Sequence, residues 1–124
     1  MKLVAGLSAL MLAIGLASLV LWRRSPESVP CESRDITHSR SPDDRSEADV
    51  FELHCGPSVT THVALRSSMS APKSHADVFV AEDLVPIQVI WTGPRELLVQ
   101  SSAARVLVAE TRWRDVSVKI RPQQ

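Results

Sequence analysis

Residues 41–56 read SPDDRSEADVFELHCG, and this stretch decides the fold. Its first four residues, Ser-Pro-Asp-Asp at 41–44, are typical of a β-turn, because proline presets the backbone at the second position and aspartate suits the positions that follow. From 48 to 55 polar and apolar side chains then alternate with one exception, and Phe51 and Leu53 take apolar positions. A period of two predicts a strand with one buried face. The stretch therefore predicts a turn followed by a strand that ends on a cysteine.

A second alternating stretch, residues 59–65, follows the breaker Gly-Pro-Ser at 56–58. A three-residue loop would bring the apolar residues of both strands onto one face of a hairpin, whereas a two-residue loop would turn one set outward. We therefore predict the three-residue loop. The predicted pairs are Cys55 with Val59, Leu53 with Thr61, Phe51 with Val63 and, on the outer face, Glu52 with His62.

The rest of the chain continues the β pattern. Residues 67–76 are polar and predict a loop, and Thr-Gly-Pro-Arg at 92–95 predicts a hairpin turn. No segment after residue 24 has a helical period. We predict a mainly β fold of five to seven strands, arranged as a small antiparallel meander or sandwich. The further strands are predicted over residues 77–81, 87–91, 97–99, 106–109 and 116–120.

The N-terminal segment 3–22 holds twenty residues without a charge, between Lys2 and the pair Arg23-Arg24. Twenty residues of helix span roughly 30 Å, the thickness of a bilayer core, so the segment predicts a transmembrane anchor in contact with lipid. A signal peptide cleaved before Ser18 is the alternative. The predicted division is an anchor or signal segment at 1–24, a polar linker at 25–46 and a β domain at 47–121.

Cys31 and Cys55 are the two cysteines of the chain. Two cysteines behind a membrane-targeting segment favour a disulfide in an oxidising compartment, so the β domain is predicted to be extracytoplasmic, that is periplasmic. Two alternatives remain open. Cys55 as a nucleophile needs a base, but His54 faces the opposite side of the strand. A metal bound by both cysteines and two histidines lacks a ligand-spacing motif.

The composition excludes several function classes. The formal net charge is zero, which argues against a basic nucleic-acid-binding surface. The four glycines form no phosphate-binding loop. We predict no cofactor, no metal and no catalytic site. Tryptophan beside arginine favours a candidate interaction patch for a protein partner, although such tryptophans more often cap a small core. The patch residues are Trp91, Arg95, Arg112, Trp113 and Arg114.

The opening motif resembles the Ser-Pro-Asp-Gly turn, strand and Cys-Gly of small uncharacterised bacterial envelope proteins. The later segments VIWTGPRELLV and ETRWRDVSVKI resemble theirs as well, so the resemblance covers residues 31–121. It implies the β topology and the paired cysteines, and it implies no substrate, because the activity of that family is not established. Asp44 stands here where the turn usually carries glycine.

Together these features predict a single-pass membrane protein with an extracytoplasmic β domain, which binds or scaffolds and is not an enzyme. Two alternatives are a secreted β protein after signal cleavage and a small envelope hydrolase. A hydrolase would require a convergent polar pocket, for example with His38 or His75 hydrogen-bonded to a free Cys55.

Overall fold

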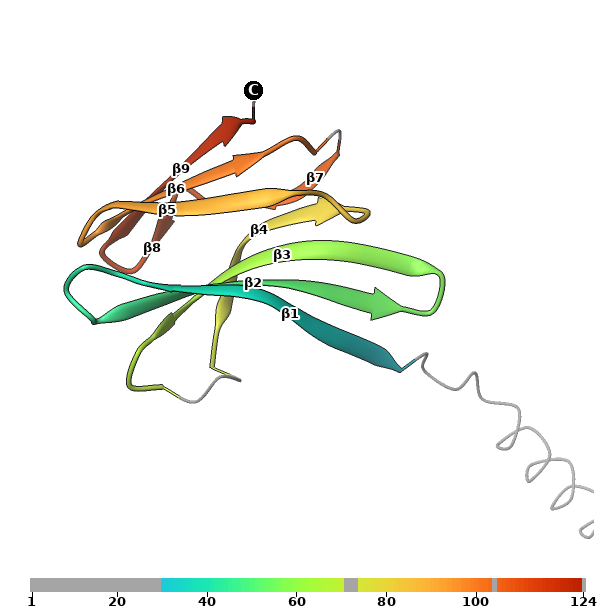
Figure 1. Cartoon of the computed structure of the whole chain (residues 1–124), viewed down its shortest axis with the longest axis horizontal. Helices are drawn as coiled ribbons and strands as arrows, with labels where there is room; N and C mark the ends of the chain where they lie inside the picture. Colours follow the sequence, from blue (N-terminus) through green and yellow to red (C-terminus); the bar gives the residue numbers. More distant parts are fainter. Residues whose placement is uncertain (1–29, 71–73, 104, 124) are drawn as a thin grey trace, which may run out of the picture.

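The computed structural model describes residues 30–70, 74–103 and 105–123, which form nine strands in two facing sheets (Figure 1). Sheet A has the order β1-β2-β3-β4-β7 and sheet B the order β5-β6-β9-β8. The described part contains no helix, so the mainly β prediction is confirmed at that level. The strands are β1 (Cys31–Arg40), β2 (Ser46–Cys55), β3 (Ser58–Ser67), β4 (Ala76–Glu82), β5 (Ile87–Gly93), β6 (Glu96–Ser101), β7 (Val106–Ala109), β8 (Arg112–Trp113) and β9 (Val116–Pro122).

One buried cluster joins the two sheets into a sandwich. Apolar side chains of β2, β3 and β4 meet those of β6 and β9, and Phe79 and Leu97 are the largest at its centre. Six of the seven strand pairs are antiparallel, but β6 and β9 run parallel. The reason is the path of the chain: it leaves sheet B after β6, adds β7 to sheet A beside β4, and returns through β8.

The predicted register of the β2–β3 hairpin is wrong by one residue. The loop contains two residues, Gly56 and Pro57, and Gly56 has a φ of 62°, which glycine adopts without steric cost. Val50 therefore pairs with Val63 in the core, while Phe51 lies on the opposite face. The alternation of polar and apolar residues predicted the wrong face for Phe51, because β2 is buried on both faces. The observed pairs are Cys55 with Ser58, Leu53 with Thr60, Glu52 with Thr61 and Phe51 with His62.

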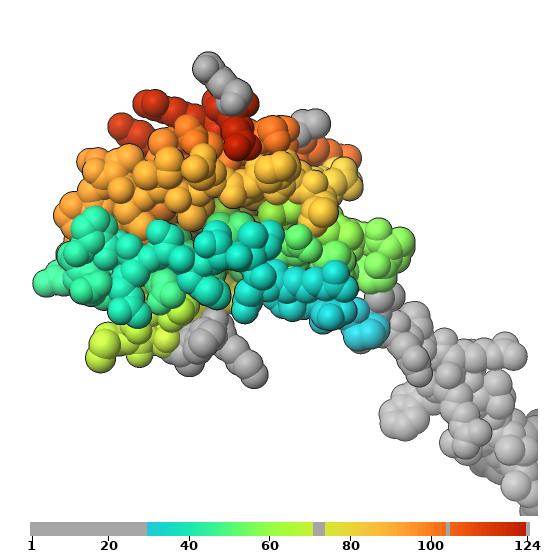
Figure 2. All heavy atoms as spheres, viewed as in Figure 1, coloured from blue at the N-terminus to red at the C-terminus, as the bar shows by residue number. Residues whose placement is uncertain are grey.

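The predicted polar linker at 25–46 is wrong for residues 31–40, which form β1 and pair with β2 along its length. β1 is an edge strand whose residues are exposed except for half-buried Ser39, so it carries no apolar alternation to read. Figure 2 shows this part of the chain, coloured cyan to teal, exposed along the side of the domain. The β domain of the structure thus begins before residue 47.

The turn at 41–44 is confirmed. The amide of Asp44 donates to the carbonyl of Ser41 at 3.0 Å, and the Ser41 hydroxyl donates to Asp43 at 2.6 Å. This hydroxyl is the main reason that the pKa of the Asp43 carboxyl is lowered. Asp44 has a φ of 60°, the conformation for which glycine is favoured.

The strands predicted over residues 77–81, 87–91, 97–99, 106–109 and 116–120 agree in position with β4, β5, β6, β7 and β9. The predicted number of five to seven strands is too low, because β1 and the two-residue strand β8 were not predicted and the described part of the chain contains nine. The β5–β6 hairpin turns at Pro94 and Arg95, within the predicted turn at 92–95, and the loop after β3 ends where β4 begins at Ala76. The predicted transmembrane segment 3–22 lies outside the described residues. Among the residues that are described, no helix has the length and apolar character needed to cross a membrane.

Candidate functional site

A disulfide closes one end of sheet A. Cys31, the first residue of β1, is bonded to Cys55, the last residue of β2, and their Cα atoms lie 4.2 Å apart. The two residues are register partners, so the strand pairing itself brings the sulfurs together. The disulfide prediction is confirmed, and the described residues contain no free cysteine. The reading of Cys55 as a nucleophile is therefore wrong for this form of the chain.

The two tryptophans of the predicted patch mainly support the core. Trp91 is half-buried against the core cluster, and its Nε1–H donates to the Ser39 carbonyl at 3.0 Å. Trp113 also packs against that cluster, and the guanidinium carbon of Arg114 lies 4.7 Å from its ring centroid. Each tryptophan therefore connects a surface strand to the interior. This is the more common role of such tryptophans, which cap a small core.

The structure brings together part of the patch. Arg95, Trp113 and Arg114 line one open hollow of about 400 Å³, while Trp91 and Arg112 are not among its lining residues. Arg95 forms ion pairs with Asp43, at 3.6 Å, and with Asp115. Because these acids neutralise Arg95, the hollow is less basic than the sequence suggests.

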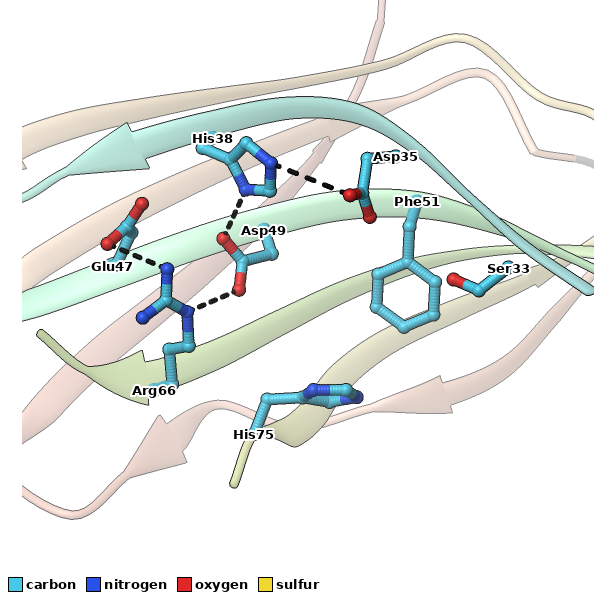
Figure 3. Close-up of a pocket in the computed structure, with 8 residues that line it drawn as sticks. All are labelled: Ser33, Asp35, His38, Glu47, Asp49, Phe51, Arg66 and His75. Atoms are coloured by element: carbon cyan, nitrogen blue, oxygen red, sulfur yellow. Dashed lines mark hydrogen bonds and ion pairs between the residues drawn. The ribbon is translucent and has the colours of Figure 1, made fainter. Parts of the chain in front are cut away.

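A second hollow lies on the outer face of sheet A, the face that points away from sheet B (Figure 3). Its volume is about 470 Å³. We call it the polar hollow, because six of its eight lining side chains are carboxylate, guanidinium or imidazole groups. The lining residues are Ser33, Asp35 and His38 from β1, Glu47, Asp49 and Phe51 from β2, Arg66 from β3, and His75 just before β4.

A β-bulge places His38 in this hollow. The pairing of β1 with β2 shifts between Asp35 and Thr37, so that Ile36 is an extra residue in the strand. In a regular strand, residues 35 and 38 would point to opposite faces. With the bulge, Asp35 and His38 line the same hollow.

Arg66 holds the base of the hollow together. Its Nε donates to Asp49 Oδ2 at 2.8 Å, its Nη2 lies 2.9 Å from Glu47 Oε2, and its Nη1 lies 3.5 Å from the Ser70 carbonyl. The exposed fractions of these side chains are 13% for Arg66, 10% for Asp49 and 14% for Glu47. Charges buried to this degree are costly to desolvate and require one another. Each of the three guanidinium nitrogens therefore has a partner inside the protein.

His38 stands between two carboxylates. Its Nδ1 lies 2.6 Å from Asp49 Oδ1, and its Nε2 lies 3.9 Å from Asp35 Oδ2 (Figure 3). The hydrogen bond to Asp49 is the main reason that the pKa of His38 is raised; partial burial opposes this shift, and the charges of Asp49, Asp35 and Glu47 add to it.

Phe51 forms the aromatic wall. Its ring stacks on His62, with centroids 4.9 Å apart, and meets His75 edge-on at 5.3 Å. His62 Nε2 shares a 2.7 Å hydrogen bond with the Thr60 hydroxyl. His62 Nδ1 lies 3.3 Å from Asp77 Oδ2, but outside hydrogen-bond geometry. The hollow thus has one apolar side and one charged side.

One group of side chains has the spacing of metal ligands. Ligand atoms of His38, Glu47 and Asp49 all lie within 4.8 Å of one another. Arg66 already occupies both carboxylates, so a cation among these three would have to displace the guanidinium. Asp35 Oδ2 and His38 Nε2 lie instead at the β1 side of the hollow, 3.9 Å apart.

Sequence reasoning missed this site. It placed His38 in a linker and assigned no role to Asp49 or Arg66. One signal was present: Glu47, Asp49 and Phe51 recur with a period of two, which marks a second ordered face of the strand.

The chain matches no protein-family model, no curated protein and no solved structure. The fold and the hollow therefore define its class: a disulfide-linked β-sandwich domain with a polar hollow on one outer face.

Proposed function

We propose that the chain is a single-pass membrane-anchored protein whose β-sandwich lies on the extracytoplasmic side and works as a binding domain. The anchor is the apolar segment 3–22, and the domain begins at Cys31, so a short tether joins them. The polar hollow is the binding surface in this proposal. No enzymatic role is proposed.

The disulfide is the observation that carries the proposal. Disulfides persist in oxidising compartments and are rare in the cytosol. Cys31 and Cys55 pair at the end of sheet A through which the chain enters the domain, behind a segment of membrane-spanning length. A cytosolic domain would gain little from this arrangement, because reducing conditions would keep the bond open.

The hollow supports a binding role. Sheet A packs its other face on the core, so its outer face has no structural need for clustered charges. Burying Arg66, Asp49 and Glu47 there costs desolvation, and well-packed apolar residues often serve stability as well or better. Ionisable groups that are perturbed by burial and by charged partners beside a hollow mark a candidate functional site.

The test of compartment is the redox state of the cysteines in native membranes. Free thiols are blocked with an alkylating mass tag before lysis, and peptides are read by mass spectrometry without reduction. A linked Cys31–Cys55 peptide is expected. Two alkylated thiols would contradict an extracytoplasmic location.

The test of the anchor is alkaline carbonate extraction of the same membranes. A retained anchor keeps the chain in the pellet, with Met1 peptides present. A chain that is released into the supernatant and begins at Ser18 would instead establish the secreted alternative.

One observation favours the hydrolase alternative. The buried Asp49 orients His38 as it would orient a general base. Within the described part of the chain, however, His38 Nε2 lies 3.9 Å from Asp35 Oδ2, and a carboxylate is not the serine or cysteine nucleophile that such a hydrolase requires. Esterase and peptidase assays that compare the chain with Asp49→Asn test this alternative, and equal background rates would exclude it for those substrates.

A further inference from the structure

The nitrogen of His38 that faces Asp49, Nδ1, acts as a hydrogen-bond donor. Asp49 accepts hydrogen bonds from both His38 Nδ1, at 2.6 Å, and Arg66 Nε, at 2.8 Å. A carboxylate that accepts hydrogen bonds from a guanidinium acts as an acceptor toward a second donor as well. The proton of a neutral His38 therefore sits on Nδ1, and the lone pair sits on Nε2.

That lone pair faces another acceptor. Nε2 lies 3.9 Å from Asp35 Oδ2, and both groups line the polar hollow. Two acceptors that face each other need a donor or a cation between them. A bridging water or a proton on Nε2 meets this need, and so does a metal ion.

We infer that Asp35 Oδ2 and His38 Nε2 form a binding site for a divalent transition-metal ion of the zinc class, with Asp49 as the outer carboxylate that orients the imidazole. This inference deepens the proposed function, since it names the ligand class of the polar hollow. Metal-binding histidines usually donate their second N–H to a carboxylate, as His38 does.

The geometry suits zinc better than magnesium or calcium. Imidazole with carboxylate suits zinc, whereas the harder ions prefer oxygen ligands alone. Two ligands at bonds of about 2.0–2.1 Å around a tetrahedral ion stand roughly 3.3 Å apart. The observed 3.9 Å is close to this, and the Asp35 side chain, at 72% exposure, is free to rotate. The hollow of about 470 Å³ has room for the solvent ligands that complete the coordination.

The inner group of His38, Glu47 and Asp49 is the competing assignment. It would use Nδ1 in place of Nε2 and would break the contacts of Arg66 with two carboxylates buried to 10% and 14% exposure. Removing a partner from buried charges is strongly destabilising. The outer pair requires no such rearrangement.

The test is calorimetric titration of ZnCl₂ into the full oxidised chain, purified in detergent without a histidine tag and freed of metal with a chelator. Zinc binding is expected to weaken at least tenfold in His38→Gln and in Asp35→Asn. Asp49→Asn is expected to weaken it about tenfold or more, as losses of orienting carboxylates do. Circular dichroism and the intact disulfide mass show that each variant is folded.

His54→Gln is the matched control. His54 Nε2 lies 2.9 Å from Glu52 Oε2, so it is also a histidine beside a carboxylate, but neither residue lines the polar hollow. Its zinc affinity is expected to stay within twofold of the unmodified chain.

A direct readout separates ligation from simple charge attraction. In ¹⁵N NMR of the imidazoles, zinc is expected to shift His38 Nε2 far more than Nδ1. No binding up to about 1 mM zinc, an unchanged affinity in His38→Gln, or an equal loss in His54→Gln would overturn the inference. A loss in Glu47→Gln but not in Asp35→Asn would overturn it in favour of the inner group. The cysteine labelling described above does not depend on zinc, so the two proposals fail separately.

Discussion

At the scale of residues, Arg66 is the side chain on which the polar hollow depends. It contacts Asp49 and Glu47 at 2.8 and 2.9 Å, and all three are largely buried on the outer face of sheet A. Such a cluster resists partial removal, because each remaining charge keeps its desolvation cost after its partner has gone.

Arg66→Ala is expected to lower the free energy of unfolding toward the lower end of about 3–5 kcal/mol, since it leaves two carboxylates unpaired. Urea unfolding of the oxidised chain measures this. Arg105→Ala is the control, because Arg105 pairs with Glu82 at the surface, with exposed fractions of 74% and 41%. The control is expected to lose less than about 1 kcal/mol. Equal losses in both variants would mean that the cluster is not buried as described.

His38 gives the domain a pH dependence whose sign follows from its pKa. Because Asp49 raises this pKa in the folded chain, protonated His38 favours folding. The contribution is complete below the ordinary value of 6.5 and is lost as the pH rises through the raised folded value. We expect the stability difference between the chain and His38→Gln to be largest near pH 5 and to shrink above pH 7, measured with a chelator present. A difference that grows with pH would contradict the raised pKa.

At the scale of elements, the sequence predicted the strands that carry an apolar pattern and missed β1 and the two-residue strand β8. β3, β5 and β6 alternate and β4 is a short apolar run, and all four were predicted near their observed bounds. β1 lies at an exposed edge, so pairing with β2 and the disulfide hold it, and neither leaves an apolar pattern. β2 is buried on both faces, so the alternation selected the wrong face for Phe51.

The bulge at Ile36 explains why the site was not predicted. Bulges arise from local backbone choice, and the sequence around Ile36 contains no glycine that would mark one. Without the bulge, strand alternation separates Asp35 from His38.

Deleting Ile36 is therefore expected to leave a regular strand in which Asp35 and His38 stand two positions apart, both on the face of the hollow, so that His38 keeps its contact with Asp49. The fold should survive, because Ile36 is 51% exposed and contributes little to the core. Imidazole NMR is expected to show that the hydrogen bond at Nδ1 persists, while β3 and β4 amides keep their exchange protection. Loss of the His38–Asp49 hydrogen bond would show that Ile36 is not the extra residue of the strand.

At the scale of the whole molecule, the two sheets depend on one shared core. Phe79 of β4 and Leu97 of β6 are each 1% exposed and belong to the same cluster. Neither sheet buries this cluster alone, so the domain is expected to unfold as one unit.

Phe79→Ala is expected to cost about 3–5 kcal/mol and Leu97→Ala about 2–5 kcal/mol, because each leaves a cavity between the sheets. In a Trp22→Phe background, tryptophan fluorescence reports Trp91 and Trp113 of sheet B, and far-ultraviolet circular dichroism reports both sheets. The two signals should share one midpoint in each variant. Separate midpoints would show that the sheets unfold independently.

The position of the disulfide has a mechanical consequence. The chain enters the domain at Cys31, and tension arriving there would peel β1 from the sheet edge one backbone hydrogen bond at a time. The covalent bond to Cys55 passes that load directly to β2, which is held by neighbours on both sides. A pulling force would then load the pairing of β2 with β3 instead of the free edge of β1, so the bond protects the edge strand from being peeled away.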